Sequence, residues 1–172
     1  MDNQTQPHKV EEQGHEKISS AKLSKILVAV DGSEESFKAA QYAIDLAKKE
    51  KEKAQLIALT VNEIAATSSF LNIIEPSALK KWRGQIKSES ETFFKRISTY
   101  GLDIDGSQVH LRAEVIDSAQ PAYAAIINYA EKENIDLIVL GTRGKTGFKR
   151  ILLGSVASGV VTHASCPVLV VK

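Results

Sequence analysis

The chain has few of the features that mark secreted, membrane-spanning or nucleic-acid-binding proteins. It contains one cysteine, Cys166, which cannot form an internal disulfide bond. No apolar run approaches the roughly 20 residues that a membrane-spanning helix needs, and residues 1–20 lack the apolar centre of a secretory signal. The net charge is only +1 at pH 7, whereas a nucleic-acid partner usually needs a strongly basic surface. We therefore expect a cytoplasmic protein without membrane or nucleic-acid contacts.

Several signatures of catalysis and of nucleotide binding are also missing. There is no Gly-x4-Gly-Lys-Ser/Thr sequence, no Gly-x-Gly-x2-Gly after the first apolar run, and no Gly-x-Ser-x-Gly. His163 and Cys166 are three residues apart, but no second pair completes a zinc site. No residue stands clearly as a general base, so the sequence favours binding over catalysis.

The composition divides the chain into a short tail and one domain. Residues 1–22 are polar and contain almost no large apolar side chain, so they cannot offset the entropy cost of ordering. We predict a mobile tail there. The remaining residues, 23–172, are enough for one well-buried domain and too few for two of ordinary size.

Apolar runs and amphipathic stretches alternate along this domain. Five strands are expected, at about residues 25–30, 55–61, 109–116, 136–140 and 168–171, and all of them except the third are apolar runs of the kind found where both faces of a parallel sheet are covered. Four helices are expected, at about residues 34–50, 76–100, 119–131 and 150–164. Ser33 is expected to cap the first of them. Because crossovers between parallel strands are right-handed, the alternation predicts an open, doubly wound α/β sheet with helices on both faces.

The stretch between the second strand and the second helix is unusually apolar for a loop. Residues 62–75 begin like a loop but include Phe70, Leu71, Ile73 and Ile74. These residues either pack onto the domain or form a lid or a surface for a partner, and both interpretations stay open.

A glycine-rich loop follows the apolar run at residues 136–140. It reads Gly141-Thr142-Arg143-Gly144, then nine residues, then Gly154-Ser155 at the start of a helical pattern. Glycines let the backbone approach a ligand closely, and amide groups at a helix N-terminus attract anions. Four cations with no acid between them add positive charge: Arg143, Lys145, Lys149 and Arg150. This loop, residues 141–155 and called the glycine loop below, is predicted to bind phosphate through backbone amides that include that of Gly154.

A second loop is expected at the same edge of the sheet. Asp31-Gly32-Ser33 follows the first strand, and ligands in open α/β sheets bind beyond the carboxyl ends of strands where the strand order reverses. Asp31 suits a ribose hydroxyl or a magnesium ion, and formation of the turn or capping of the following helix is an equally good role for it. Adenine would lie against the strand ends around Ala29, Val30 and Val61.

These residues together resemble the universal stress protein family in its ATP-binding branch. The resemblance rests on the glycine loop, on the apolar runs at 136–140 and 166–171, and on residues 26–33. It implies strand order 3-2-1-4-5, an adenine nucleotide in the crevice, and a homodimer formed largely through Val168 to Val171. The resemblance further implies that Asp31 contacts the ribose region, that Val61 contacts adenine through its backbone, and that the glycine loop surrounds the phosphates. The predicted nucleotide-binding residues are Ala29, Val30, Asp31, Val61, Leu140, Gly141, Arg143, Gly144, Lys145, Gly154, Ser155 and Val156.

The leading hypothesis is a dimeric, ATP-binding regulatory protein of the stress response with little or no turnover. One alternative is a slow Mg²⁺-dependent ATPase or a phosphotransferase, because the cationic loop could stabilise transition-state charge. Another alternative is a nucleotide-free dimeric chaperone or scaffold. AMP, ADP and a cyclic dinucleotide stay open as ligands beside ATP, and the protein partner is not identified.

Overall fold

The computed structural model describes residues 22–50, 53–64, 76–100, 109–144 and 153–172. Four features expected from the sequence therefore lie outside the described residues. They are the tail up to residue 21, the apolar segment from Phe70 to Ile74, Lys145, and the pair of cations Lys149 and Arg150.

Strands and helices alternate along the chain as the hydrophobic pattern predicts. In chain order they are β1 (Lys25–Ala29), α1 (Glu34–Ala47), β2 (Ala54–Glu63), α3 (Pro76–Ser98), β3 (Val109–Ser118), α4 (Ala122–Glu133), β4 (Leu137–Gly141), α5 (Ser155–His163) and β5 (Val168–Val171).

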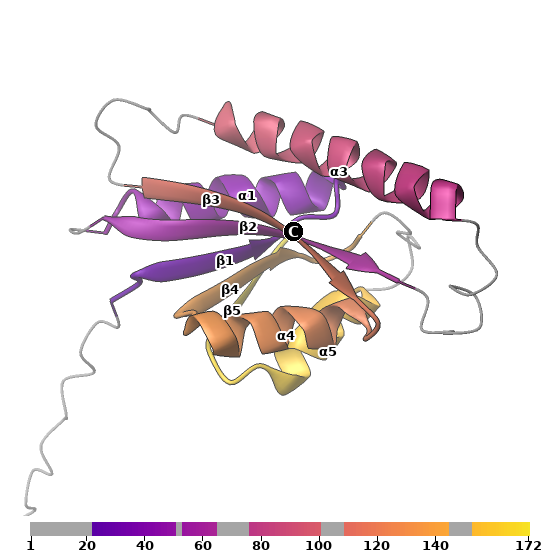
Figure 1. The fold of residues 1–172 in the computed structure, drawn as a ribbon. Coiled ribbons are helices and arrows are strands. Elements are labelled where there is room, and N and C mark those ends of the chain that lie inside the picture. The colour runs from indigo at the N-terminus through magenta and orange to yellow at the C-terminus, as the bar shows by residue number, and fades with distance from the viewer. Residues whose placement is uncertain (1–21, 51–52, 65–75, 101–108, 145–152) are drawn as a thin grey trace, which may run out of the picture.

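The five strands form one sheet in the order β3-β2-β1-β4-β5, and every adjacent pair is parallel. Helices α1 and α3 cover one face, and α4 and α5 cover the other (Figure 1). The expected doubly wound fold and strand order are thus confirmed. The chain winds outward from β1 to β3, then returns to β4 beside β1. This reversal puts the loops after β1 and β4 next to each other.

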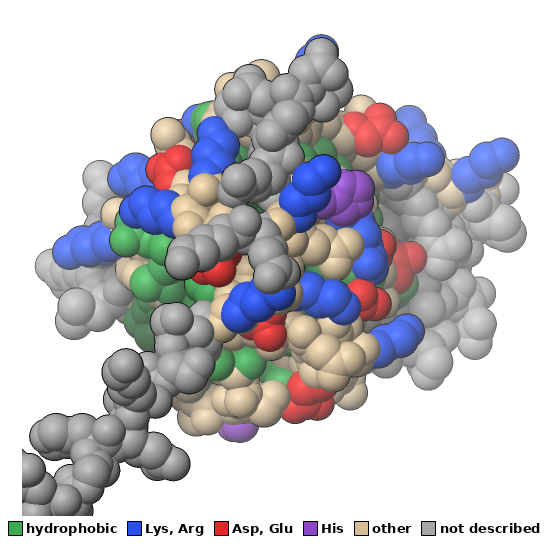
Figure 2. All heavy atoms as spheres, turned by 90° about the vertical axis from the view of Figure 1, so that its left-hand side faces the viewer, with side chains coloured by type: hydrophobic (Ala, Val, Ile, Leu, Met, Phe, Trp, Pro, Cys, Tyr) green, Lys and Arg blue, Asp and Glu red, His purple; other side chains and the backbone are tan. Residues whose placement is uncertain are grey.

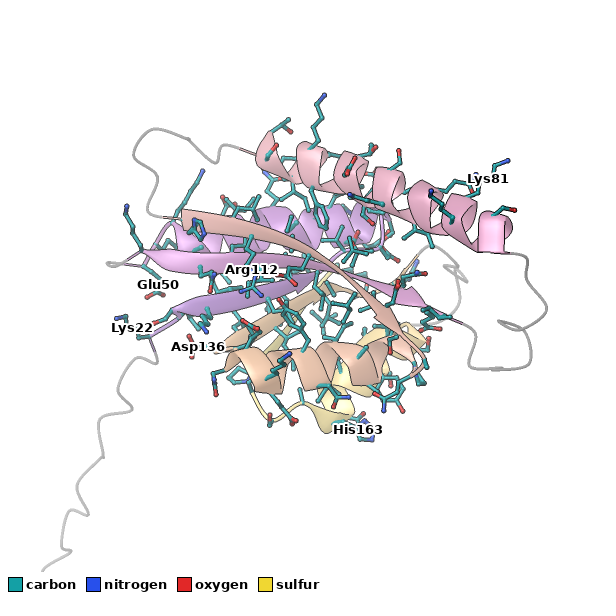
Figure 3. All side chains as sticks on the ribbon, in the orientation of Figure 1. Lys22, Glu50, Lys81, Arg112, Asp136 and His163 are labelled. Carbon is teal, nitrogen blue, oxygen red and sulfur yellow. The ribbon has the colours of Figure 1, made fainter. Side chains whose placement is uncertain are left out.

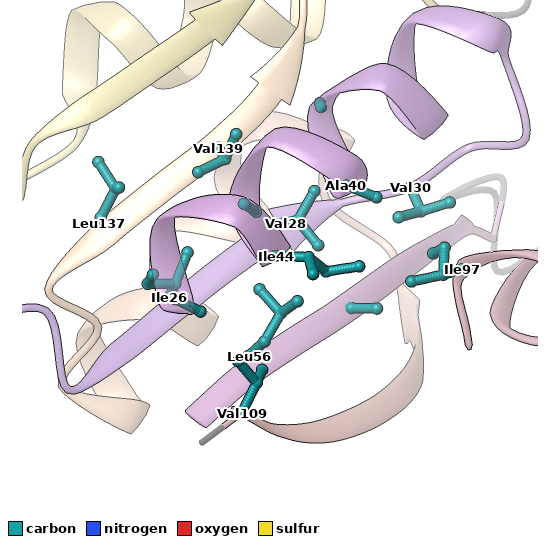
Figure 4. Close-up of a cluster of buried hydrophobic side chains, with 14 of the residues drawn as sticks. Ile26, Val28, Val30, Ala40, Ile44, Leu56, Ile97, Val109, Leu137 and Val139 are labelled. Carbon is teal, nitrogen blue, oxygen red and sulfur yellow. The ribbon is translucent and has the colours of Figure 1, made fainter. Parts of the chain in front are cut away.

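Each face of the sheet has its own hydrophobic core. Between the sheet and α1, Val28, Ile44 and Leu56 are fully buried, and Ile97 of α3 joins them (Figure 4). On the other face, the core centres on fully buried Leu27, Ile57 and Ile138 under α4 and α5. Because the central strands contribute to both cores, they contain near-continuous apolar runs.

Element boundaries differ from the predicted ones in informative places. The Ser33 cap is confirmed, since the Ser33 side chain accepts a hydrogen bond from the Ser36 amide. Strand β2 continues to Glu63, so residues 62 and 63 are paired with β3 instead of forming a loop. Helix α5 begins at Ser155, not near residue 150. Gly154 has an extended backbone, with φ −68° and ψ 161°.

The end of the sheet at the amino ends of the strands carries mixed charge. Basic and acidic side chains are interspersed on this face (Figure 2). On the described part of the chain, no helix is long and apolar enough to cross a membrane.

Candidate functional site

A pocket of about 420 Å³ opens at the carboxyl ends of β1 and β4, where the strand order reverses. This volume lies within the range of small-molecule sites, roughly 300–1,000 Å³. All the residues predicted to bind nucleotide line it except Lys145, which lies outside the described residues. Its other lining residues, which the sequence reasoning did not select, are Ser36, Leu59, Glu63, Ala122, Ile126, Thr142 and Ala157.

The loop after β1 is held by its own hydrogen bonds. Asp31 Oδ1 accepts from the Ser33 amide at 3.0 Å and from Ser33 Oγ at 2.6 Å. Ser33 Oγ in turn accepts from the Ser36 amide at 3.2 Å. Asp31 therefore stabilises the turn that leads into α1, which is a role left open by the sequence, whereas Ser33 itself caps the helix. Its carboxylate also lines the pocket wall.

Gly32, in the same loop, has a backbone conformation that other residues rarely adopt. Its φ of +86° is unfavourable for other residues, and a Cβ there would collide with the Phe93 ring of α3. The loop that supplies Asp31 thus rests directly on α3. Arg96, one turn further along α3, pairs with Glu34 in the first turn of α1 at 2.8 Å and lies 3.9 Å above the Phe37 ring centre.

The three pocket glycines meet different neighbours. A Cβ on Gly141 would lie 2.7 Å from the backbone carbonyl carbon of Glu35, so this glycine allows α1 to approach β4. A Cβ on Gly144 would lie 2.6 Å from Asp31 Oδ2, so Gly144 allows the glycine loop to approach the first loop. A Cβ on Gly154 would lie 3.3 Å from the Thr142 carbonyl oxygen and 3.5 Å from Arg143 Cα, so this site is less crowded.

The amide of Gly154 is already used within the protein. It donates to the Thr142 carbonyl oxygen at 2.7 Å, which joins the two ends of the glycine loop. The expectation that this amide faces phosphate is therefore wrong for the structure as described.

The N-terminus of α5 forms one end of the pocket. Among the described residues no side chain caps it, and its first turn contains no acidic residue. Its first amides, including those of Ser155 and Val156, have no partner within the helix. Arg143 lies beside it, and its buried Nε has no hydrogen-bond partner within the described part of the chain. Unsatisfied donors and a helix N-terminus favour a bound anion.

The opposite end of the pocket is apolar and lies between β2 and α4. Leu59 and Val61 of β2 pack in the same cluster as Ile126 of α4. One charged side chain, that of Glu63, also lines this end of the pocket. It is held there by a hydrogen bond, in which Glu63 Oε1 accepts from the Ala122 amide at 2.6 Å. Sequence reasoning missed Glu63 since residue 62 onward was expected to be a loop. Continuing the alternation of β2 by two residues from Val61 would have found it.

A polar cluster on the α4 face of β3 lies outside the pocket. Arg112, labelled in Figure 3, bonds Glu114 at 2.7 Å, Glu133 at 3.2 Å and the Tyr129 hydroxyl at 2.8 Å. Burial raises the pKa of the Tyr129 hydroxyl, with a further contribution from the negative charge of Glu114. These groups pair with one another, so the cluster fastens α4 to the edge strand. Within the described residues, no group of three or more His, Cys, Asp or Glu residues could hold a metal ion.

The fold and the pocket define a doubly wound α/β protein with a ligand site at the reversal of its strand order. The chain matches the universal stress protein family over residues 22–172, and it belongs to that family. Two relatives share most of their length with it. Universal stress protein MJ0531 of Methanocaldococcus jannaschii is 38% identical over 86% of this chain and 81% of its own. YxiE of Bacillus subtilis is 31% identical over 87% of this chain and 99% of its own.

Solved structures show the same fold. The structure of MJ0577, also from Methanocaldococcus jannaschii, superposes with a TM-score of 0.71 at 26% identity, covering 88% of this chain and 96% of that one. A universal stress protein in complex with cAMP gives a TM-score of 0.61 at 20% identity, covering 88% and 98%. The Archaeoglobus fulgidus protein in complex with dAMP gives 0.57 at 17% identity, covering 86% and 97%.

Proposed function

We propose that this protein is a regulatory protein of the stress response that binds an adenine nucleotide, ATP before AMP or ADP, with little or no turnover. The observation that carries the proposal is the polarity of the pocket. One end is apolar, between β2 and α4, and the other end combines Arg143 with the uncapped N-terminus of α5. A nucleotide has the same polarity, with a flat apolar base at one end and phosphates at the other.

Each part of the nucleotide has a matching wall. The base would lie against Val61 and Ile126, and the ribose would lie near Asp31 in the middle of the pocket. The phosphates would accept hydrogen bonds from the first amides of α5 and from Arg143. Asp31 could also contact a Mg²⁺ ion carried by the nucleotide. The proteins bound to cAMP and dAMP share this fold with the chain, which supports an adenine nucleotide as the ligand class.

The first experiment is to identify what the purified protein carries. The protein is precipitated, and released small molecules are separated by HPLC and identified by mass spectrometry. The stripped protein is then titrated with ATP, ADP and AMP by calorimetry. A released or tightly bound adenine nucleotide is expected, and a protein that is empty and ignores all three nucleotides contradicts the proposal and leaves the scaffold alternative.

Two substitutions test whether the nucleotide uses this pocket. Gly144→Val and Gly154→Val place branched side chains in the phosphate end and are expected to abolish binding while the circular dichroism spectrum keeps its α/β shape. Gly84→Val is a matched control, since a Cβ on exposed Gly84 meets no atom within 4 Å. Unchanged affinity in both pocket variants would mean that the nucleotide binds elsewhere.

Slow hydrolysis of ATP is the second candidate. Asp31 and Arg143 line the same pocket, so it contains both a carboxylate and a cation. Arg143 could stabilise transition-state charge, and Asp31 could hold Mg²⁺. Phosphate release that exceeds background, requires Mg²⁺ and disappears in Asp31→Ala would favour the enzyme. Tight binding without release would favour the regulator.

We also propose a homodimer formed through β5. This strand is an edge of the sheet, and all four of its residues are apolar and only partly buried. Such an edge invites pairing with another strand. The carbonyls of Pro167 and Val171 accept bonds from β4, so the amide of Val170, which alternates with them, points away from the sheet.

Val170→Pro therefore removes an outward donor without breaking the pairing between β4 and β5. Light scattering is expected to give the mass of a dimer for the unmodified protein and for Val170→Thr, and of a monomer for Val170→Pro. A dimer in all three proteins would place the interface elsewhere.

A further inference from the structure

We infer that Glu63 selects the base of the bound nucleotide, favouring a purine with an amino group at position 6 over one with a carbonyl there. The inference rests on the proposed nucleotide site and assigns to Glu63 a specificity role within it. The base would be adenine, and the disfavoured competitor would be hypoxanthine.

The sheet places Glu63 at the base end of the pocket. Alternate residues of a strand share a face, so Leu59, Val61 and Glu63 all point toward α4. Leu59 and Val61 pack there against the core that contains Ile126, and all of these residues line the pocket. Glu63 stands two residues beyond Val61, where the apolar wall ends.

The hydrogen bond to α4 fixes the carboxylate in this place. The N-cap of α4 is Pro121, which provides no side-chain hydrogen bond, and Glu63 Oε1 accepts from the Ala122 amide instead. At 2.6 Å this bond is as short as charge-assisted bonds usually are. Glu63 is exposed, yet one of its oxygens is anchored at the positive end of a helix.

The remaining hydrogen-bonding capacity of Glu63 is open to a ligand. An ionised carboxylate offers about four lone-pair sites and no donor. Within the described residues, the Ala122 amide is its only hydrogen-bond partner in the structure. A group that accepts and never donates suits the amino group of adenine and repels the carbonyl oxygen of hypoxanthine.

The charges at the two ends of the pocket are well separated. Glu63 lies on β2 and the glycine loop follows β4, with β1 between them. Since neighbouring strands are about 4.8 Å apart, the two ends are about 10 Å apart. The carboxylate can therefore face the base without facing the phosphates, which bind near Arg143.

The test compares nucleotides that differ only in the base. Calorimetric titrations with ATP and ITP, repeated with AMP and IMP, give the preference for adenine in the unmodified protein and in Glu63→Gln. Glutamine keeps an acceptor for the Ala122 amide, and its amide group can donate to a carbonyl at position 6. We expect the preference for adenine to fall at least about tenfold in both nucleotide pairs, mainly through tighter binding of ITP and IMP, because a site built for one hydrogen-bonding pattern rejects the other strongly.

Asp117→Asn is the matched control. Asp117 is the last residue but one of β3 and pairs with Asn62, the neighbour of Glu63 in β2; it accepts a hydrogen bond from the Asn62 side-chain amide at 2.8 Å and does not line the pocket. Its substitution should leave the preference unchanged. If ATP and AMP bind but Glu63→Gln keeps the full preference for adenine, the inference is wrong and Glu63 only caps α4; a lowered unfolding temperature with an unchanged preference would also show a capping role alone. If the unmodified protein binds none of the four nucleotides, the proposed function itself fails.

Discussion

Two helices begin beside the same pocket, and their first turns are built differently. Helix α1 has a complete cap, since Ser33 accepts from the Ser36 amide and Glu34 and Glu35 bring negative charge to the first turn. Helix α5 has a glycine at its N-cap, no side-chain cap and no acidic residue in its first turn. Every helix N-terminus has unsatisfied amides and a positive potential.

The difference shows which helix is left for a ligand to complete. The positive potential at the N-terminus of α1 is compensated by the side chains of its own cap and first turn. The Arg96 guanidinium already pairs with Glu34 of that turn. Within the described residues, α5 has neither a capping side chain nor an acidic residue in its first turn to compensate its positive potential. Arg143 adds a further positive charge. An anion in the pocket would accept hydrogen bonds from the first amides of α5 and compensate its positive potential, as Ser33, Glu34 and Glu35 do for α1.

The largest expected effect comes from giving α5 the charge that α1 has. Ser155→Asp places a carboxylate in the first turn of α5, which favours the helix but opposes phosphate. Like charges forced together cost several kcal/mol, so the dissociation constant for ATP should rise about 100-fold or more. The unfolding temperature should stay the same or rise. Ser155→Ala is the control, which loses only the hydroxyl. Normal ATP affinity in Ser155→Asp would contradict the anion role of α5.

A smaller effect is expected from adding one methyl group at each end of the glycine loop. In Gly144→Ala the new Cβ would lie 2.6 Å from Asp31 Oδ2, so the two loops must separate. Overpacking of this kind costs about 1–3 kcal/mol, and ATP affinity should fall about tenfold or more. In Gly154→Ala the nearest atom is 3.3 Å away, so the loss should be smaller. Calorimetry that ranked the two variants in the opposite order would overturn this interpretation of the loop.

Removing the cap of α1 should lower stability more than binding. Ser33→Ala leaves the Ser36 amide without its side-chain acceptor, and such a loss typically costs about 1 kcal/mol of unfolding free energy. Urea denaturation measures it. Thr162→Ala is the control, because that exposed hydroxyl donates to the Ser158 carbonyl of its own helix and, in the part of the chain that the structure describes, to no other group. A cost no greater than that of the control would mean that α1 does not depend on Ser33.

The smallest effect concerns the ion pair that joins α3 to the first turn of α1. The hydrogen bond from Arg96 lowers the pKa of the Glu34 carboxyl below its ordinary value of 4.5. A lowered pKa contributes stability above pH about 4.5 that is lost as the pH falls through the lowered value. Both side chains are largely exposed, so the contribution is small. Arg96→Gln should reduce the loss of stability below pH about 4.5, measured by urea denaturation at several pH values; an unchanged pH profile would contradict it.

Local patterns were sufficient for most of the fold. Buried strands such as β1 and β4 need apolar side chains on both faces, so they appear as short continuous runs in the sequence. The cap at Ser33 was predictable because it involves residues three apart. Boundaries were less predictable. Continuous pairing with β3 carries β2 through Asn62 and Glu63, two polar residues that give no strand signal of their own.

The sequence predicted which loops line the candidate site, but it did not predict some of the hydrogen bonds within that site. The glycine loop and Asp31 were found because their residue types and spacing suit phosphate and ribose. The bond that occupies the Gly154 amide and the anchoring of Glu63 on Ala122 were not found. Both depend on contacts between segments whose distance and direction the sequence does not state.

The sequence by itself determined the alternation of strands and helices and the chemistry of the two loops, because both depend on neighbouring residues. Only the tertiary structure decided that Asp31 and Gly144, far apart in the chain, approach so closely that no side chain fits between them. It also decided that Glu63 stands across the pocket from Arg143. The physical reason is that strand pairing and helix packing set these distances, and both arise from the burial of two hydrophobic cores, one on each face of the sheet.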